Sequence, residues 1–207
     1  MPLDLWLAFA AASAILLAIP GPTILLVTAY ALGAGRRVAL WMTLGVFLGD
    51  LLAISLAVLG LGAVLMASAT LFTMLKIAGG LYLLWLGWKL LRAPVEGGAL
   101  DAKRTGKSGP AMCLHAFAVT ATNPKSIVFF IAFLPQFVSH DAPAAPQMLA
   151  MVATFTLLGA LNALIYALAA GTLRERIRRP AVMRWMNRGG GAALMAMGLA
   201  TIMARRA

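Results

Sequence analysis

Three groups of residues could carry chemistry in an otherwise strongly apolar chain. The first is Asp50, the only acidic residue within any long apolar stretch. The other two are short interruptions of apolar runs, at Pro20-Gly21-Pro22 and at the triplet Asn123 to Lys125. Proline removes a backbone donor and disturbs the preceding helical turn, and a charge in hydrocarbon is costly, so a simple anchor helix would not keep these residues. They are therefore the candidate functional residues.

The composition indicates an integral membrane protein. The chain has 207 residues, of which 62% are hydrophobic and 11% charged. An average soluble domain is about 45–50% apolar and about 25% charged, so this chain has too little polar material to cover a soluble surface. The net charge of +11 would suit nucleic acid, but the basic residues lie in short clusters between apolar stretches, as in membrane-protein loops. We therefore expect no nucleic-acid partner.

The few residues that bind metals or form disulfides are scattered. Cys113 is the single cysteine, so no intramolecular disulfide and no cysteine-based metal cage can form. His115 and His140 lie far from any second cluster of ligand residues. We expect neither a metal site nor a cofactor.

Six apolar stretches are long enough to cross a bilayer of about 30 Å. They cover residues 5–32, 38–66, 70–91, 110–134, 147–172 and 190–204, with a hydrophilic linker at 92–109. The linker divides the stretches into two sets of three, and two related units of three helices would have opposite orientations, as in many secondary transporters. The predicted fold is all-α: one transmembrane transporter domain over residues 1–207, with six transmembrane helices in two inverted three-helix repeats and with broken helices 1 and 4.

The basic residues predict the orientation. The first, third and fifth connections carry two, five and six Lys or Arg residues, whereas the second and fourth carry none. Positively charged loops stay in the cytoplasm, so the N-terminus is expected outside and the 92–109 linker inside. Arg205 and Arg206 are an exception, because the same scheme places them outside. The N-terminus lacks the basic start of a cleaved signal peptide, so we interpret the first segment as a retained helix.

The candidate residues should lie at similar depths. Counted from the predicted cytoplasmic helix ends, Gly21 lies ~17 Å deep and Asp50 ~18 Å deep. Lys125 and Asn162 come out at ~22 Å and ~15 Å. A carboxylate at such a depth must be protonated, paired or wetted by a cavity. Asp50 is then either a structural partner of Lys125 or a functional residue, which carries a proton or balances the charge of a substrate amine. Its depth is similar to that of the two helix breaks, which favours a functional role.

The two breaks offer opposite polarities. At the first, the prolines leave carbonyl groups of the preceding turn without donors, and a substrate ammonium could take that place. At the second, Asn123 can cap a half-helix that begins at Pro124, whose N-terminal dipole would attract a carboxylate together with Lys125. A zwitterion fits both ends, although two plain proline kinks used for packing are the alternative. Gly45 and Gly49 form a GxxxG step that favours close helix packing.

Several stretches match a known family. The sequence resembles the LysE/RhtB family of amino-acid exporters along essentially its whole length, in "IPGPTILLVTAYALGAGRRVAL", "LGVFLGDLLAISLAVLGLGAVL", "LKIAGGLYLLWLGWKLLR", "ATNPKSIVFFIAFLPQFV" and "MRWMNRGGGAALMAMGL". The resemblance implies a small inner-membrane exporter, driven by the proton motive force and often dimeric, for amino acids such as homoserine, threonine, leucine or lysine and their analogues. The family's Gly-Asp falls on Gly49 and Asp50, and its PGP and Asn-Pro-Lys motifs fall on the two breaks. Where family members usually have a bulkier polar residue after PGP, this chain has Thr23.

The predicted function is an efflux permease that exports an amino acid or close analogue by alternating access and proton antiport. Asp50 would couple the proton or balance the amine, and the expected substrate-binding residues are Pro20, Gly21, Pro22, Thr23, Asn123, Pro124, Lys125 and Asn162. The expected partners are the substrate, protons and the lipid bilayer, with a homodimer left open. The alternatives are an exporter of another small solute or ion, or a structural or regulatory membrane subunit without transport. We expect no enzyme, because the spans lack paired carboxylates, a metal cluster and a nucleophile beside a base.

Overall fold

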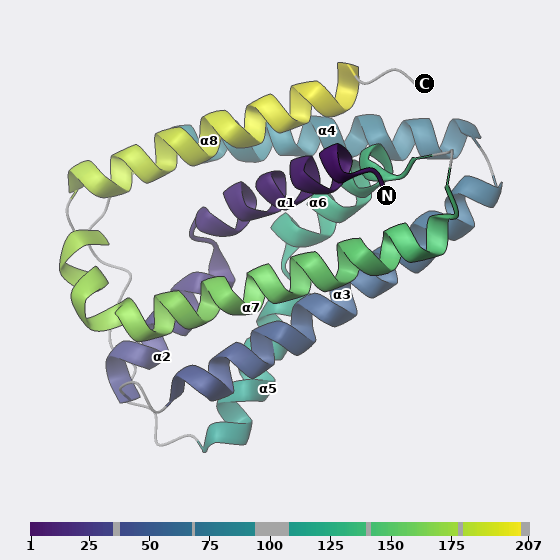
Figure 1. Ribbon diagram of the computed structural model, residues 1–207. Helices are drawn as coiled ribbons and strands as arrows, with labels where there is room; N and C mark the ends of the chain where they lie inside the picture. The colour runs from purple at the N-terminus through teal and green to yellow at the C-terminus, as the bar shows by residue number, and fades with distance from the viewer. Residues whose placement is uncertain (35–37, 68, 94–107, 140–141, 178–179, 204–207) are drawn as a thin grey trace.

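The computed structural model describes residues 1–34, 38–67, 69–93, 108–139, 142–177 and 180–203. All the regular secondary structure in these ranges is helical, which confirms the predicted all-α class (Figure 1). The elements are α1 (Leu3–Ala18), α2 (Pro22–Ala34), α3 (Ala39–Ala67), α4 (Ala69–Leu91), α5 (Gly109–Ala121), α6 (Pro124–Phe133), the 3-10 turn η2 (Leu134–Phe137), α7 (Ala144–Ile177) and α8 (Pro180–Met203).

The long helices follow the predicted spans closely, except at the C-terminal end. α3 and α4 nearly coincide with the predicted 38–66 and 70–91, and α7 extends past both ends of the predicted 147–172. α8 begins at Pro180, well before residue 190, because the polar turns that carry Arg184 and Arg188 are also helical. Most of the predicted 92–109 linker lies outside the described residues.

Few of the described helices are individually long and apolar enough to cross a membrane. The two that are cover Ala39–Gly60 and Ala144–Ala170, and α1 with α2 would add a third if this pair, bent by 54°, forms one span. The half-helices α1, α2, α5 and α6 have 16, 13, 13 and 10 residues. Each is shorter than the roughly 20 residues that a helical span needs, so each could cross only together with its neighbour in the chain. The six spans and their inverted repeat therefore stay a prediction.

Glycines allow two pairs of helices to pack closely. α3 lies along α5, and α4 lies along α8 (Figure 1). A Cβ atom added to Gly49 would lie 2.7 Å from the Cβ of Thr120, and one added to Gly45 would overlap the backbone of α5. A Cβ atom on Gly87 of α4 would lie 2.6 Å from the carbonyl oxygen of Gly191 in α8. The prediction that Gly45 and Gly49 serve close helix packing is thus confirmed.

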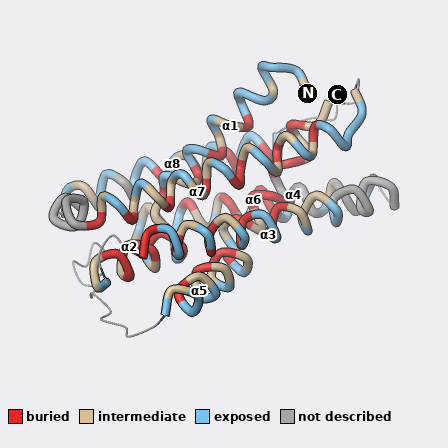
Figure 2. Tube along the Cα trace, turned by 60° about the horizontal axis from the view of Figure 1, so that its bottom comes forward, coloured by how far each residue is buried: buried red, intermediate tan, exposed pale blue. Residues whose placement is uncertain are grey.

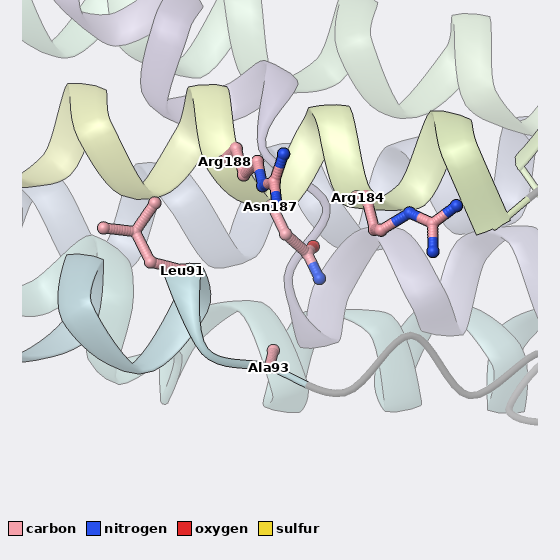
Figure 3. Close-up of a pocket in the computed structure, with 5 residues that line it drawn as sticks. All are labelled: Leu91, Ala93, Arg184, Asn187 and Arg188. Carbon is pink, nitrogen blue, oxygen red and sulfur yellow. The ribbon is translucent and has the colours of Figure 1, made fainter.

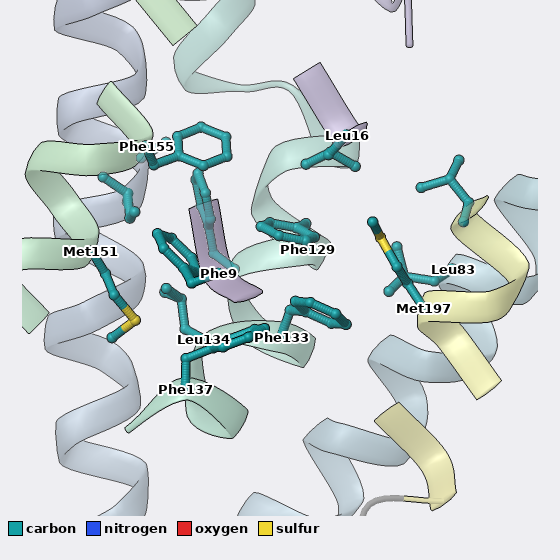
Figure 4. Close-up of a cluster of buried hydrophobic side chains, with 14 of the residues drawn as sticks. Phe9, Leu16, Leu83, Phe129, Phe133, Leu134, Phe137, Met151, Phe155 and Met197 are labelled. Carbon is teal, nitrogen blue, oxygen red and sulfur yellow. The ribbon is translucent and has the colours of Figure 1, made fainter. Parts of the chain in front are cut away.

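An aromatic cluster fixes the position of α6. It joins side chains of α1, α6, η2 and α7 (Figure 4). The rings of Phe129 and Phe133 stack with their centroids 4.9 Å apart, and Phe130 meets Phe155 of α7 edge-on at 4.6 Å. Such ring pairs stabilise packing beyond their buried area. The helix that begins at the second break is therefore held firmly against its neighbours.

Large apolar side chains cover much of the outside of the bundle. Figure 2 shows exposed residues along the outer faces of the helices and buried ones where helices meet. Leu40, Leu59 and Leu149 are 75%, 70% and 69% exposed. Soluble monomers rarely expose extended apolar surface, whereas lipid-facing helices do so throughout. The surface therefore agrees with the membrane protein that the composition predicts.

Candidate functional site

The second break has the geometry of a capped helix start. Asn123 has an extended backbone, with φ −68° and ψ 109°, and its Oδ1 accepts a hydrogen bond of 3.1 Å from the backbone N–H of Lys125. Pro124 occupies the first helical position, where its missing N–H costs nothing. The predicted cap by Asn123 is confirmed. It directs the N-terminal end of α6 into the interior of the bundle.

Thr23 joins the two breaks. It lies at the start of α2, just after the first break, and is buried. Its hydroxyl oxygen accepts a hydrogen bond of 3.3 Å from Nδ2 of Asn123 and another of 3.3 Å from the hydroxyl of Thr120. The two interruptions, about a hundred residues apart in the chain, thus meet in space.

Lys125 binds the end of α1. Its Nζ donates hydrogen bonds of 2.9 Å to the carbonyl oxygen of Leu16 and 2.8 Å to that of Ile19. The sequence predicts carbonyl groups at this break that need donors. In this closed arrangement an ammonium of the protein itself, and not a ligand, satisfies two of them.

Two side chains of α7 cap the remaining carbonyl groups at the end of α1. Asn162 donates from Nδ2 to the carbonyl oxygen of Leu17 at 3.0 Å, and the hydroxyl of Tyr166 donates to that of Ala18 at 3.1 Å. A helix end leaves four carbonyl groups without intrahelical partners. Here all four, from Leu16 to Ile19, accept a side-chain hydrogen bond from another helix. The break is therefore held by specific polar contacts, more than a plain proline kink requires.

Asp50 lies on α3 across a small cavity from this cluster. Its side chain is 2% exposed and lines the same cavity as Lys125, so an acidic and a basic group share one buried space. Gly159 of α7 lies directly against the carboxylate, and its missing side chain leaves room for it, because a Cβ atom there would meet Oδ2 of Asp50.

The cavity brings most of the predicted site residues together. Its described lining consists of Leu17, Gly21, Thr23, Ile24, Val46, Asp50, Asn123, Lys125, Ser126, Gly159 and Asn162. The prolines at positions 20, 22 and 124 are not among these lining residues, and they shape the breaks instead. The volume is about 20 Å³, enough for about one water molecule and far too small for an amino acid. In this structure the cavity is therefore closed to a ligand of that size.

Sequence reasoning missed several residues of the site, three of which helical spacing could have supplied. Val46 lies one turn before Asp50, and Gly159 and Tyr166 lie three residues before and four after Asn162. Residues three and four apart share a helix face, so a polar residue in a span points to its neighbours on that face. Ser126, directly after the second break, had a weaker signal because serine is common in such helices.

A larger cavity lies at the end of α4 and the start of α8 (Figure 3). It has a volume of about 360 Å³ and is lined by Leu91, Ala93, Arg184, Asn187 and Arg188. Ala93 is the last described residue before 94–107, and none of the predicted site residues reaches this space.

Comparisons with known proteins identify relatives over nearly the whole chain. A family model described as LysE type translocator matches residues 14–205, which include both breaks, Asp50 and the whole cavity lining. An uncharacterized membrane protein of Vibrio cholerae is 33% identical over 204 residues, covering 96% of this chain and 97% of the relative. A homoserine/homoserine lactone efflux protein of Salmonella typhimurium is 31% identical over 209 residues, covering both chains completely, and its counterpart in Salmonella typhi matches equally.

No solved structure was found to match the chain. The family model spans most of the chain, and full-length relatives are more than 30% identical to it. The chain belongs to the LysE type translocator family.

Proposed function

We propose that the protein is an inner-membrane efflux permease that exports an amino acid or a close analogue in exchange for protons. The observation that carries this proposal is the meeting of two helix breaks and a buried aspartate around one small cavity. Family membership and the efflux activity named for the Salmonella relatives support an amino-acid-type substrate. A subunit without transport would have no need for a buried carboxylate beside two broken helices.

In this proposal the cavity is the closed form of the substrate site. Asp50 takes up and releases the coupling proton or balances the substrate amine. Asn123 and Lys125 orient the substrate carboxylate at the start of α6, where the helix dipole favours negative charge. Gly21, Thr23 and Asn162 form the remaining wall, and Pro20, Pro22 and Pro124 keep the backbone broken. Because the cavity holds about one water molecule, opening must widen it from either side in turn.

We further propose that six spans in two inverted repeats make this movement. Matching neighbours in the two halves support the repeat. α1 runs parallel to α7, since Trp6 bonds Thr154 and Leu17 bonds Asn162. α5 runs parallel to α3, since Gly45 faces Cys113 and Gly49 faces residues 117 to 121. The first half-helix in each half of the chain thus packs along a long helix of the other half, α1 along α7 and α5 along α3, which is consistent with two repeats that rock against each other.

The proposed orientation has the N-terminus outside and the basic connections in the cytoplasm. The end of α4 supports it, because Lys89 and Arg92 lie over the exposed rings of Trp85 and Trp88 at 5.1 and 3.9 Å from the ring centroids. Tryptophan with lysine or arginine is typical of a membrane interface, and basic residues favour its cytoplasmic side.

Transport in everted membrane vesicles tests the function. Vesicles with an acidic lumen, with and without the protein, are given radiolabelled homoserine, threonine, leucine or lysine. We expect accumulation of at least one of them inside protein-containing vesicles, and its collapse when a protonophore removes the gradient. No accumulation of any of these compounds above protein-free vesicles would contradict the proposal, and accumulation that ignores the protonophore would contradict the proton coupling.

A further inference from the structure

The four carbonyl groups at the end of α1 form two pairs that have different kinds of hydrogen-bond donor. Leu17 and Ala18 receive an amide and a phenol from α7, which are neutral groups. Leu16 and Ile19 share a primary ammonium, the Nζ of Lys125. A primary ammonium is also the cationic group of every ordinary amino acid. The chain therefore contains a site already shaped for that group.

The surroundings of Nζ suit an ammonium that leaves and returns. Lys125 and Asp50 line the same cavity, so any cation held by the two carbonyl groups has a carboxylate nearby. Gly21 borders the ammonium without crowding it, because even a Cβ atom there would lie 3.4 Å from Nζ, an ordinary contact distance. The two hydrogen bonds to carbonyl oxygens use two of the three N–H donors of Lys125, which leaves the third for the cavity side.

A buried ammonium needs such partners continuously. Removing a charge from water is expensive unless it is paired and hydrogen-bonded. If Lys125 leaves the carbonyl groups during transport, a second cation must replace it there, or both the carbonyl groups and Asp50 lose their partner. A substrate ammonium is the group that a widened cavity would supply.

We propose that the carbonyl oxygens of Leu16 and Ile19 form the amine subsite of the transporter, and that Lys125 occupies it in the closed state as a tethered substitute for the substrate ammonium. This inference rests on the proposed function and adds to it a substrate class: compounds with a free primary amine. Substrate and Lys125 exchange places, which releases Lys125 towards the substrate carboxylate. Compounds whose amine is acylated cannot make the exchange.

Chemical rescue of stability tests the subsite without any transport assay. The substitution Lys125→Ala removes the three outer methylene carbons and the nitrogen, and n-propylammonium carries the same atoms. We expect the purified variant to melt at a lower temperature than the wild type, and n-propylammonium to restore about half or more of the loss in a saturable manner, as ligand binding to the folded state does. Tetramethylammonium at equal ionic strength, which has no N–H donor, should have no such effect.

Tyr166→Phe is the matched control. It removes one cap from the same helix end but leaves Lys125 in place, so n-propylammonium should not stabilise it. If n-propylammonium shifts the melting temperature of both variants equally, or of neither, the subsite assignment is wrong. Should Lys125→Ala not be recovered in folded form, Lys125→Gln with methylammonium replaces it, because glutamine is shorter and leaves the ammonium position open.

The outcomes separate this inference from the proposed function. If n-propylammonium restores the stability of Lys125→Ala but the wild type exports no amino compound, the amine subsite is supported and the exporter function is contradicted. If the wild type exports an amino acid but n-propylammonium restores no stability, the exporter function is supported and the subsite is contradicted.

Discussion

Asp50→Asn is expected to lower gradient-driven export to the background of protein-free vesicles, a loss of about 100-fold or more, as when a group that must exchange a proton is removed. Asparagine has nearly the same shape but cannot carry the proton, and it cannot balance a cation in the cavity. Membrane insertion should be unchanged, because the substitution removes a charge from a buried position on α3. The measurements are accumulation in everted vesicles and the amount of protein in the membrane.

Exchange transport distinguishes the two roles of Asp50. If the carboxylate only carries the proton, labelled substrate should still exchange with unlabelled substrate across the membrane in the Asp50→Asn variant. If it also balances the substrate amine, exchange is lost as well. Asp4→Asn removes the same charge from an exposed position in the first turn of α1 and should transport normally. Full gradient-driven export by Asp50→Asn would refute the coupling role.

The second large effect is expected from Gly159→Ala, which alters no charged or polar group. The added methyl group would meet Oδ2 of Asp50, so the carboxylate must turn away or α7 must move outwards. Both changes disturb the balance of charges in the cavity. We expect export to fall about tenfold or more, consistent with the sensitivity of sites to misplacements of about 1 Å.

Gly60→Ala is the control for this substitution. It adds the same methyl group to α3 at a position where nothing lies within 4 Å of the new atom. Because alanine favours helix over glycine by about 1 kcal/mol, this variant should be at least as stable as the wild type and should export normally. Equal export by Gly159→Ala and Gly60→Ala would show that the position of the Asp50 carboxylate is not critical.

The sequence predicted the helices well where a single physical signal decided them. α3 and α4 match because their apolar runs are long and contain no proline. The start of α8 was missed because hydropathy marks the part of a helix that suits lipid, whereas backbone hydrogen bonds carry the helix on through polar residues such as Arg184. The number of spans cannot be decided in the same way, since the half-helices on either side of each break are too short to pass as spans alone.

Most of the residues predicted for the candidate site line the cavity, but their contacts could not be predicted. Proline and the preceding asparagine carry local rules, so the break at Pro124 and its cap by Asn123 could be predicted. The hydrogen bonds from Lys125 to α1 join residues more than a hundred positions apart, and no local rule specifies such a pair. For this reason the sequence assigned the free carbonyl groups to a ligand, whereas the closed structure fills them with the protein's own side chains.

The cavity between the breaks is the proposed path of the substrate, and the accessibility of Ser126 tests this path most directly. Ser126 is buried and lines the cavity, and Cys113 is the single native cysteine. In a Cys113→Ala background, Ser126→Cys should react with a charged, membrane-impermeant thiol reagent only when the cavity opens. Leu161→Cys, on α7 next to Asn162 but 53% exposed on the outer surface, should stay unreactive in lipid.

We expect Ser126→Cys to be labelled from the cytoplasmic face and, under a reversed gradient, from the outer face, with a transported amino acid slowing both reactions. Labelling from both faces, slowed in each case by a transported amino acid, would place the thiol at position 126 on the path of the substrate. A thiol at position 126 that reacts no faster than the one at 161 from either face would contradict the account.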